Sequence, residues 1–133
     1  PRPLLEPPSR QGDTASIERG MLLYSYHCEV CHGIQVETGT ILSDLRSMSY
    51  ATHQAFDKIV LEGLYETAGM KSFADVLTKK DVSDLHDYLI DAGHVLWDAE
   101  HNPHPEQDRI DRENEIEAER WLKENSPKLP GAE

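Results

Sequence analysis

The chain has 133 residues, of which 38% are hydrophobic and 29% charged, and its 25 acidic and 13 basic side chains give a formal net charge of −12. This length suits one domain with tails, and no apolar run approaches the ~18 residues of a membrane span. The negative charge argues against nucleic acid or an anionic membrane surface as a partner and would suit a basic protein surface.

The first part of the chain predicts a tail followed by a helix. Residues 1–12 hold four prolines and few helix signals, which is typical of an extended linker or tail. Apolar side chains then recur at helical spacing, at Ile17, Met21, Tyr24 and Cys28. We therefore expect an amphipathic helix over residues 15–27.

Two further helices are predicted in the middle of the chain. Residues 52–62 carry an apolar stripe and are followed by Gly63, a common helix stop. A loop that contains Met70 comes next. The third helix starts at Thr78, whose spacing from Asp81 approximates a capping box, and we expect it to end at Gly93.

The composition shifts after Gly93, because residues 94–133 carry 11 acidic and 5 basic side chains. Pro105 fits the first position of a helix that runs to about Glu124, which we expect to be mostly solvated and anchored by Trp97 or Trp121. A surface metal site is conceivable at His94, His101 and His104, although a solvated turn is the default interpretation.

No stretch alternates as a strand, so the sequence predicts an all-α protein. We divide it into a proline-rich linker or tail at 1–12, a core domain at 13–93 and an acidic helical extension at 94–133.

The two cysteines of the chain lie in the segment Cys28-Glu29-Val30-Cys31-His32. A zinc site would need a fourth ligand, a thioredoxin-type dithiol would need a preceding strand, and a plain disulfide would not need the histidine. The remaining interpretation is covalent haem, with Cys28 and Cys31 bonded to the two vinyl groups and His32 as the proximal iron ligand. We favour haem c over the other three.

The sixth position of the iron then has several candidate ligands. Met21 lies on the apolar face of the first helix, where core packing is expected, and Met48 lies in the first long loop. Met70 follows Gly69 in a loop that could present its thioether across from His32, and it is our favoured ligand, with a histidine or an open site as alternatives. Thioether ligation raises the reduction potential, and an iron with two protein ligands has no place for a substrate. The pattern therefore favours electron transfer over catalysis.

The sequence at this point resembles a class I cytochrome c, in which three core helices surround one haem. More narrowly, it resembles the cytochrome domain at the C-terminus of quinohaemoprotein alcohol dehydrogenases, in which a proline-rich linker follows a pyrroloquinoline quinone (PQQ) β-propeller. The resemblance covers roughly residues 3–93. It is carried by Pro3–Pro8, Arg19-Gly20, Tyr24, Cys28–Gly33, Asp44–Arg46, His53, Phe56, Ile59–Leu61, Gly63, Gly69-Met70, Ser72–Leu77, Asp81-Val82 and Tyr88–Ile90.

The resemblance implies further roles for single residues. Gly20 would lie where the first and last core helices cross, with Tyr24, Leu85 and Tyr88 packed there. A backbone carbonyl near Ser43 would accept a hydrogen bond from Nδ1 of His32. Arg46 would pair with a haem propionate or, alternatively, lie on the surface.

The chain departs from the family pattern at two positions, Ser43 and Lys71, where proline is common. Loss of the proline after Met70 would leave the methionine loop less rigid. The acidic extension is also not part of the usual domain.

The function that we expect is electron transfer through covalent haem c and its iron. The donor would be a PQQ-dependent dehydrogenase, and the acceptor a cytochrome, a copper protein or an oxidase in the bacterial periplasm. The chain would be a domain of that dehydrogenase, reached through the linker, or else a free periplasmic carrier. A haem sensor with a labile methionine is the alternative from another class. Since covalent haem is attached outside the cytoplasm, we expect an export signal upstream.

Overall fold

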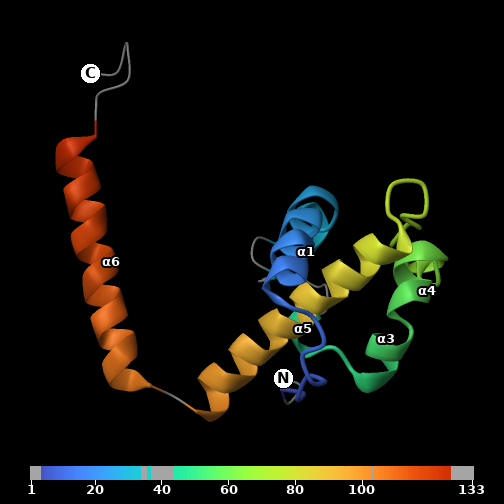
Figure 1. Ribbon diagram of the computed structural model, residues 1–133, viewed down its shortest axis with the longest axis horizontal. Helices are drawn as coiled ribbons and strands as arrows, with labels where there is room; N and C mark the ends of the chain where they lie inside the picture. The colour runs from blue at the N-terminus through green and yellow to red at the C-terminus, as the bar shows by residue number, and fades with distance from the viewer. Residues whose placement is uncertain (1–3, 34–35, 37–43, 103, 127–133) are drawn as a thin grey trace. The chain divides into compact units, whose positions relative to one another are not determined.

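The computed structural model describes residues 4–33, 36, 44–102 and 104–126, and every regular element within these ranges is a helix (Figure 1). The helices are α1 (Thr14–His27), α2 (Glu29–His32), η2 (Leu45–Ser47), α3 (Tyr50–Gln54), α4 (Phe56–Leu61), η3 (Glu66–Ala68), α5 (Lys79–His101) and α6 (Pro105–Asn125). The predicted all-α class is confirmed for this part of the chain. Two compact units are formed, one up to His101 and one from Asn102 onward.

Helix α1 begins after Asp13 and ends just before the first cysteine. The carboxylate of Asp13 accepts a hydrogen bond from the backbone N–H of Ser16 at 2.8 Å, which satisfies one of the free amides of the first turn. The N–H of Cys28 donates to the carbonyl of Tyr24 at 2.9 Å. The expected core position of Met21 is wrong, because this side chain is 46% exposed. The buried face of the helix is carried by Gly20 and Tyr24 instead.

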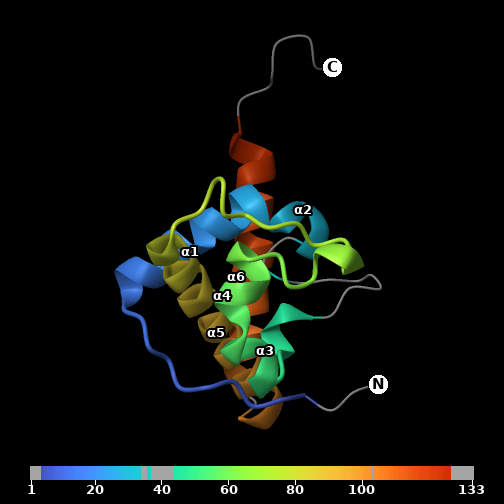
Figure 2. The same ribbon diagram turned by 90° about the vertical axis from the view of Figure 1, so that its right-hand side faces the viewer.

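The crossing of α1 with α5 confirms the expected role of Gly20 (Figure 2). A Cβ atom on Gly20 would lie 2.1 Å from the backbone oxygen of Asp84 and 2.7 Å from Cβ of Tyr88. The rings of Tyr24 and Tyr88 pack beside this point with centroids 5.6 Å apart, and Leu85 is buried there. The glycine therefore sets how closely the two helices approach.

The predicted helix at 52–62 is two short helices, α3 and α4, that meet at Ala55. The break turns the chain so that both His53 and Phe56 reach His86 on α5. Nδ1 of His53 lies 2.8 Å from Nε2 of His86, and the ring of Phe56 stacks on that of His86 with centroids 4.2 Å apart. Packing against α5 therefore overrides the continuous helical pattern.

Helix α5 has the expected start and an unexpected end. Oγ1 of Thr78 accepts from the N–H of Asp81 at 3.1 Å, and the Asp81 carboxylate accepts from the N–H of Thr78 at 2.9 Å, which completes the capping box. The expected stop at Gly93 is wrong, since the helix continues to His101. A Cβ on Gly93 would lie 2.9 Å from the backbone oxygen of Arg46 and 3.2 Å from Cβ of Pro7. This glycine permits close packing.

The described part of the proline-rich segment, residues 4–12, has no regular secondary structure and lies on the first unit. The N–H of Leu5 donates to Oγ of Ser47 at 2.9 Å. The carbonyl of Pro8 lies 2.6 Å from Nε2 of His94, and Arg10 pairs with Asp91 on α5 at 2.9 Å. The segment is thus tied to both η2 and α5.

The second unit contains α6, which confirms the helix predicted from Pro105. No residue of α6 is buried, and Trp121 is 61% exposed, so this tryptophan does not anchor the helix within its own unit. Among the described residues, no helix combines the length and the apolar character that crossing a membrane requires.

Candidate haem-binding site

The Cys28-X-X-Cys31-His32 segment forms a single helical turn directly after α1. The N–H groups of Cys31 and His32 both donate to the carbonyl of Cys28, at 3.2 and 2.9 Å. Gly33 then ends the turn with a φ of 88°, a conformation that favours glycine. The hydroxyl of Tyr24 donates to the carbonyl of Gly33 at 2.5 Å and fixes the end of the turn to α1.

The two thiols are free and lie in different surroundings. Cys28 packs against the hydrophobic core, and its burial raises the pKa of the thiol to about 12. Cys31 is exposed. No disulfide joins Cys28 and Cys31 in this structure.

His32 is held in the form that a metal ion can bind. Burial lowers the pKa of its imidazole, so the ring is neutral at pH 7. Its Nδ1 atom is buried and has no hydrogen-bond partner among the described residues. Such an atom normally donates to a carbonyl that orients a ligating ring, and the predicted acceptor near Ser43 lies outside the described residues.

The loop that carries Met70 is fixed at both ends. Gly69 has a φ of 102° at the end of η3, and the N–H of Met70 donates to the carbonyl of Tyr65 at 3.2 Å. Beyond the methionine, the N–H of Phe73 donates to the carbonyl of Val60 at 2.7 Å, and Oγ of Ser72 donates to that of Leu61 at 2.5 Å. The backbone of α4 thus holds the loop in place.

The structure brings the cysteine turn and the methionine loop together. The ring of His27, just before Cys28, meets the ring of Phe73 edge-on with centroids 6.1 Å apart. Both segments lie at the upper end of the first unit in Figures 1 and 2. Cys28, Met70 and Phe73 all pack against one core cluster. Its buried members are Tyr24, Val36, Met48, Phe56, Val60, Leu77, Val82, Leu85 and Leu89.

The donor set fits a covalent haem. Two free thiols on one turn, a neutral half-buried imidazole beside them and a thioether on a neighbouring loop are the groups that haem c uses. Two of these donors, Cys28 and Met70, pack against the apolar cluster. The other loop methionine, Met48, is buried within this cluster.

Arg46 already has a partner within the first unit. Its guanidinium donates two hydrogen bonds to the carboxylate of Asp44, at 2.8 and 3.0 Å. Burial opposes ionisation of Asp44, but the hydrogen bonds and charge of Arg46 hold the pKa of this carboxyl below its usual value. The Asp44–Arg46 pair was not predicted from the sequence, and the propionate contact of Arg46 stays a prediction.

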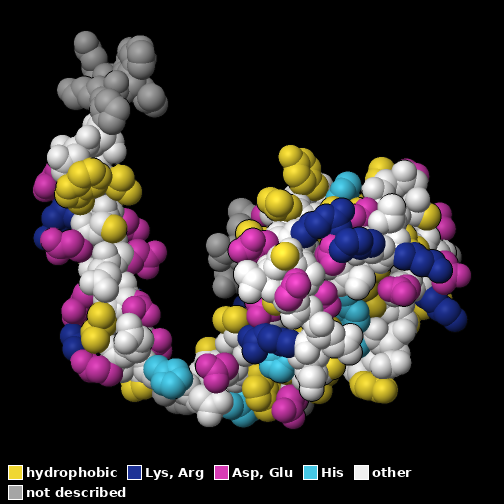
Figure 3. Space-filling model, in the orientation of Figure 1, with side chains coloured by type: hydrophobic (Ala, Val, Ile, Leu, Met, Phe, Trp, Pro, Cys, Tyr) yellow, Lys and Arg dark blue, Asp and Glu magenta, His cyan; other side chains and the backbone are white. Residues whose placement is uncertain are grey.

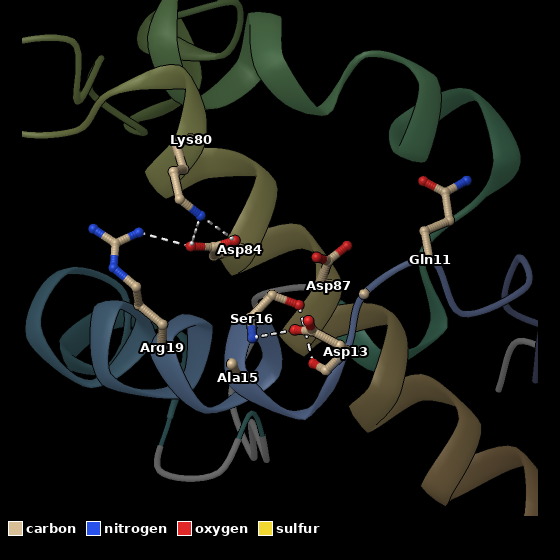
Figure 4. A pocket seen from close by; sticks show the side chains of 9 residues that line it. Gln11, Asp13, Ala15, Ser16, Arg19, Lys80, Asp84 and Asp87 are labelled. Atoms are coloured by element: carbon tan, nitrogen blue, oxygen red, sulfur yellow. Dashed lines mark hydrogen bonds and ion pairs between the residues drawn. The ribbon is translucent and has the colours of Figure 1, made fainter.

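A polar cavity of about 380 Å³ lies elsewhere, between the starts of α1 and α5 (Figure 4). Asp84 is its centre, since it pairs with Arg19 at 2.7 Å and with Lys80 at 3.2 Å. Arg19 also pairs with Asp81. None of the predicted haem ligands lines this cavity.

Two of the three histidines considered for a surface metal site, His94 and His101, have other contacts in the first unit. Among the described residues, no group of three or more histidine, cysteine or acidic side chains is placed to hold a metal ion. His94 lies against the Pro8 carbonyl, and His101 stacks on Trp97 with ring centroids 3.6 Å apart.

Comparison with known proteins decides the family. The family model described as "Cytochrome C oxidase, cbb3-type, subunit III" matches residues 15–89, more than half of the chain. The chain belongs to this cytochrome c family. Its cofactor is therefore covalent haem c with its iron, and the chain is an electron-transfer domain.

Curated relatives of this cytochrome are quinohaemoprotein dehydrogenases. It is 44% identical over 97 residues to quinohemoprotein alcohol dehydrogenase ADH-IIG of Pseudomonas putida, which covers 72% of this chain and 13% of that protein. It is 35% identical over 89 residues to ADH IIB of the same species, covering 67% and 13%. The quinone-dependent alcohol dehydrogenase subunit of Acetobacter aceti is 30% identical over 94 residues, covering 70% and 13%.

A solved structure supports the fold of this cytochrome. The structure of ADHIIG from Pseudomonas putida HK5 matches with a TM-score of 0.69 and 41% identity, over 77% of this chain and 15% of that one. The predicted cytochrome c fold is therefore confirmed, and the chain spans roughly an eighth of the length of its curated relatives.

Proposed function

We propose that this cytochrome c accepts single electrons from the reduced quinone cofactor of a PQQ-dependent dehydrogenase and passes them to a periplasmic acceptor. The acceptor would be a cytochrome, a copper protein or an oxidase. The observation that carries the proposal is the meeting of the Cys28-X-X-Cys31-His32 turn with the Met70 loop through His27 and Phe73. With His32 and Met70 both bound, the iron would have no position left for a substrate, which supports electron transfer.

Each site residue has one role in the proposal. Cys28 and Cys31 would hold the porphyrin as thioethers, and His32 and Met70 would be the two protein ligands of the iron. Arg46 lies on η2 and would share its guanidinium between Asp44 and a propionate. The haem supplies a one-electron couple between ferrous and ferric iron when bound. The rigid caps around the turn and loop keep the ligands in place as the charge on the iron changes.

The chain is proposed to act as a domain of the dehydrogenase itself. Its similarity to segments that make up only 13% of much longer quinohaemoprotein dehydrogenases supports this arrangement. The docked segment at residues 4–12 would then fix the direction in which the preceding domain joins the cytochrome. A free periplasmic carrier is the alternative.

A haem-stained denaturing gel of the periplasm, probed in parallel with an antibody to this chain, tests the proposal. Thioether-bound haem survives denaturation, so one band should carry both signals. A band several times heavier than 15.1 kDa would support the proposal that the chain is a domain of the dehydrogenase. A band at 15.1 kDa would show instead that it is a free carrier. An antibody band without haem stain would refute covalent attachment.

A further inference from the structure

Helix α6 lies beyond the residues matched by the cytochrome family, and one of its faces carries no charge. Steps of three or four residues place six uncharged side chains on this face. We name them the α6 stripe: Gln107, Ile110, Asn114, Ala118, Trp121 and Asn125. Ile110 is 37% exposed and Trp121 61%, and no residue of α6 is buried. Packing supplies most of the stability of helices in proteins, and within the described part of its own unit no element packs on this face.

Acidic side chains line one edge of the α6 stripe over its whole length and the other edge as far as Glu115, beyond which the exposed Leu122 lies. Helical geometry puts Glu106, Glu113, Glu117 and Glu124 in one row beside it, and Asp108, Asp111 and Glu115 in a row on the other side. Figure 3 shows acidic side chains along both edges of α6 with apolar ones between them.

The basic side chains of α6 lie on the opposite face. Arg109, Arg112, Arg120 and Lys123 form a row there together with Ile116. Arg109 is held by hydrogen bonds to Glu113, at 2.7 Å, and to Glu106. Residues 105–125 carry eight acidic and four basic side chains, and the geometry places the excess negative charge beside the stripe.

This distribution of charge indicates which kind of partner surface can bind the α6 stripe. A second copy of α6 would bring acidic rows against acidic rows, and the whole chain, at −12, would repel its own kind. An apolar groove edged by lysine or arginine would bury Trp121 and Ile110 and pair with both rows. Aromatic side chains such as Trp121 are the usual anchors of helix-in-groove interfaces.

We propose that the α6 stripe is a docking surface for a partner protein with an apolar groove and a basic rim. The acidic rows steer the partner and raise its rate of association, and the stripe supplies the buried contacts. Because α6 is tethered to the cytochrome, a docked partner is kept at high effective concentration near the electron-transfer site.

Site-specific photo-crosslinking in cells that produce the whole protein tests this proposal. The photoreactive residue p-benzoylphenylalanine replaces Trp121 or Ile110 in the stripe, or Ile116, which is 57% exposed on the opposite face and serves as the matched control. We expect at least five-fold more partner adduct from the two stripe positions than from Ile116. Mass spectrometry of the adduct should locate the crosslink in an apolar segment flanked by lysine or arginine.

A pair of charge variants tests the acidic rows in the same assay. The double change Glu113→Gln with Glu117→Gln should lower adduct formation at Trp121 several-fold. Glu119→Gln, which neutralises a carboxylate away from the stripe, should leave it unchanged. Circular dichroism and the haem spectrum of each variant confirm that helix and cytochrome are intact.

Four outcomes would overturn the proposal. These are equal adducts at Ile116 and the stripe, no adduct at any position, an adduct with a second copy of the chain, and an adduct with residues 4–101 of the same chain. A partner whose crosslinked segment is acidic would also refute the chemistry assigned to it.

Discussion

His53 on α3 and His86 on α5 share a hydrogen bond of 2.8 Å between Nδ1 and Nε2, and Phe56 stacks on the second ring. One proton lies between the two nitrogens, so the bond survives when the pair gains one proton and breaks when it gains two. The bond therefore links α3 to α5 only while at least one ring is neutral.

We predict that this pair makes stability depend on pH. Burial, with the nearby His86, lowers the pKa of His53 to about 4 from an ordinary 6.5, and burial lowers that of His86 while Asp57 opposes the change. The unfolded chain thus takes up more protons below pH 6.5. The contribution of His53 is fully present above pH 6.5 and is lost as the pH falls towards 4, by about 2 kcal/mol at pH 5.

Denaturant unfolding of the haem-loaded protein at pH 7.5 and pH 5, followed by circular dichroism, measures this loss. His53→Gln cannot bind a proton and should show about 2 kcal/mol less difference between the two conditions. If the stability difference between pH 7.5 and pH 5 is the same in the variant as in the parent protein, groups other than His53 cause the pH effect. Tyr50 also lines the cavity beside the pair.

Gly20→Ala should destabilise the fold. The new Cβ would lie 2.1 Å from the backbone oxygen of Asp84, which cannot rotate away as a side chain can. We expect a loss of about 1–3 kcal/mol or more in the free energy of unfolding, measured by denaturant titration. Met21→Ala, in the same helix but on its exposed side, is the control and should change stability by about 0.5 kcal/mol or less. Equal effects of the two changes would contradict the close crossing.

Met70→Leu should remove the side chain that we propose as the distal ligand of the iron. The far-red charge-transfer band of the ferric protein should disappear, and the reduction potential should fall by on the order of 0.2 V, a part of the ~0.8 V range that axial ligands cover. Met48→Leu, a change of similar volume in the core, should keep the band and the potential. Loss of the band in the Met48→Leu variant alone would mean that Met48, and not Met70, is the iron ligand.

Lys71→Pro should tighten the methionine loop. Proline removes conformational freedom from the unliganded loop, worth about 0.4–1 kcal/mol, so binding of carbon monoxide in place of Met70 should weaken by a factor of about 2 to 5. Lys71 now lies over the ring of Phe73, with Nζ 5.0 Å from the centroid. Lys71→Gln removes this charge without stiffening the chain, and its carbon monoxide affinity should match that of the parent. An equal change of carbon monoxide affinity in the Lys71→Gln and Lys71→Pro variants would show that the charge of Lys71, and not the flexibility of the loop, makes the bond between Met70 and the iron labile.

The sequence alone determined the elements whose signals are local. The apolar spacing from Ile17 onward, the Thr78–Asp81 capping box and Pro105 each mark a helix start within a few residues, and all three helices begin where expected. The cysteine turn was identified in the same way, because its chemistry depends on residues one helical turn apart. Gly20 was identified through the family resemblance rather than through its own spacing.

The tertiary structure decided what depends on residues far apart in the chain. His53 and His86 are 33 positions apart, and only the packing of α3 on α5 reveals their bond. The same packing breaks the middle helix at Ala55. Residue 93 is a glycine because Pro7 and Arg46 lie too close to leave room for a side chain, and not because the helix ends there. Local periodicity states which residues are apolar, but the crossing of helices decides which of them are buried, and for this reason Met21 is exposed while Met48 is in the core.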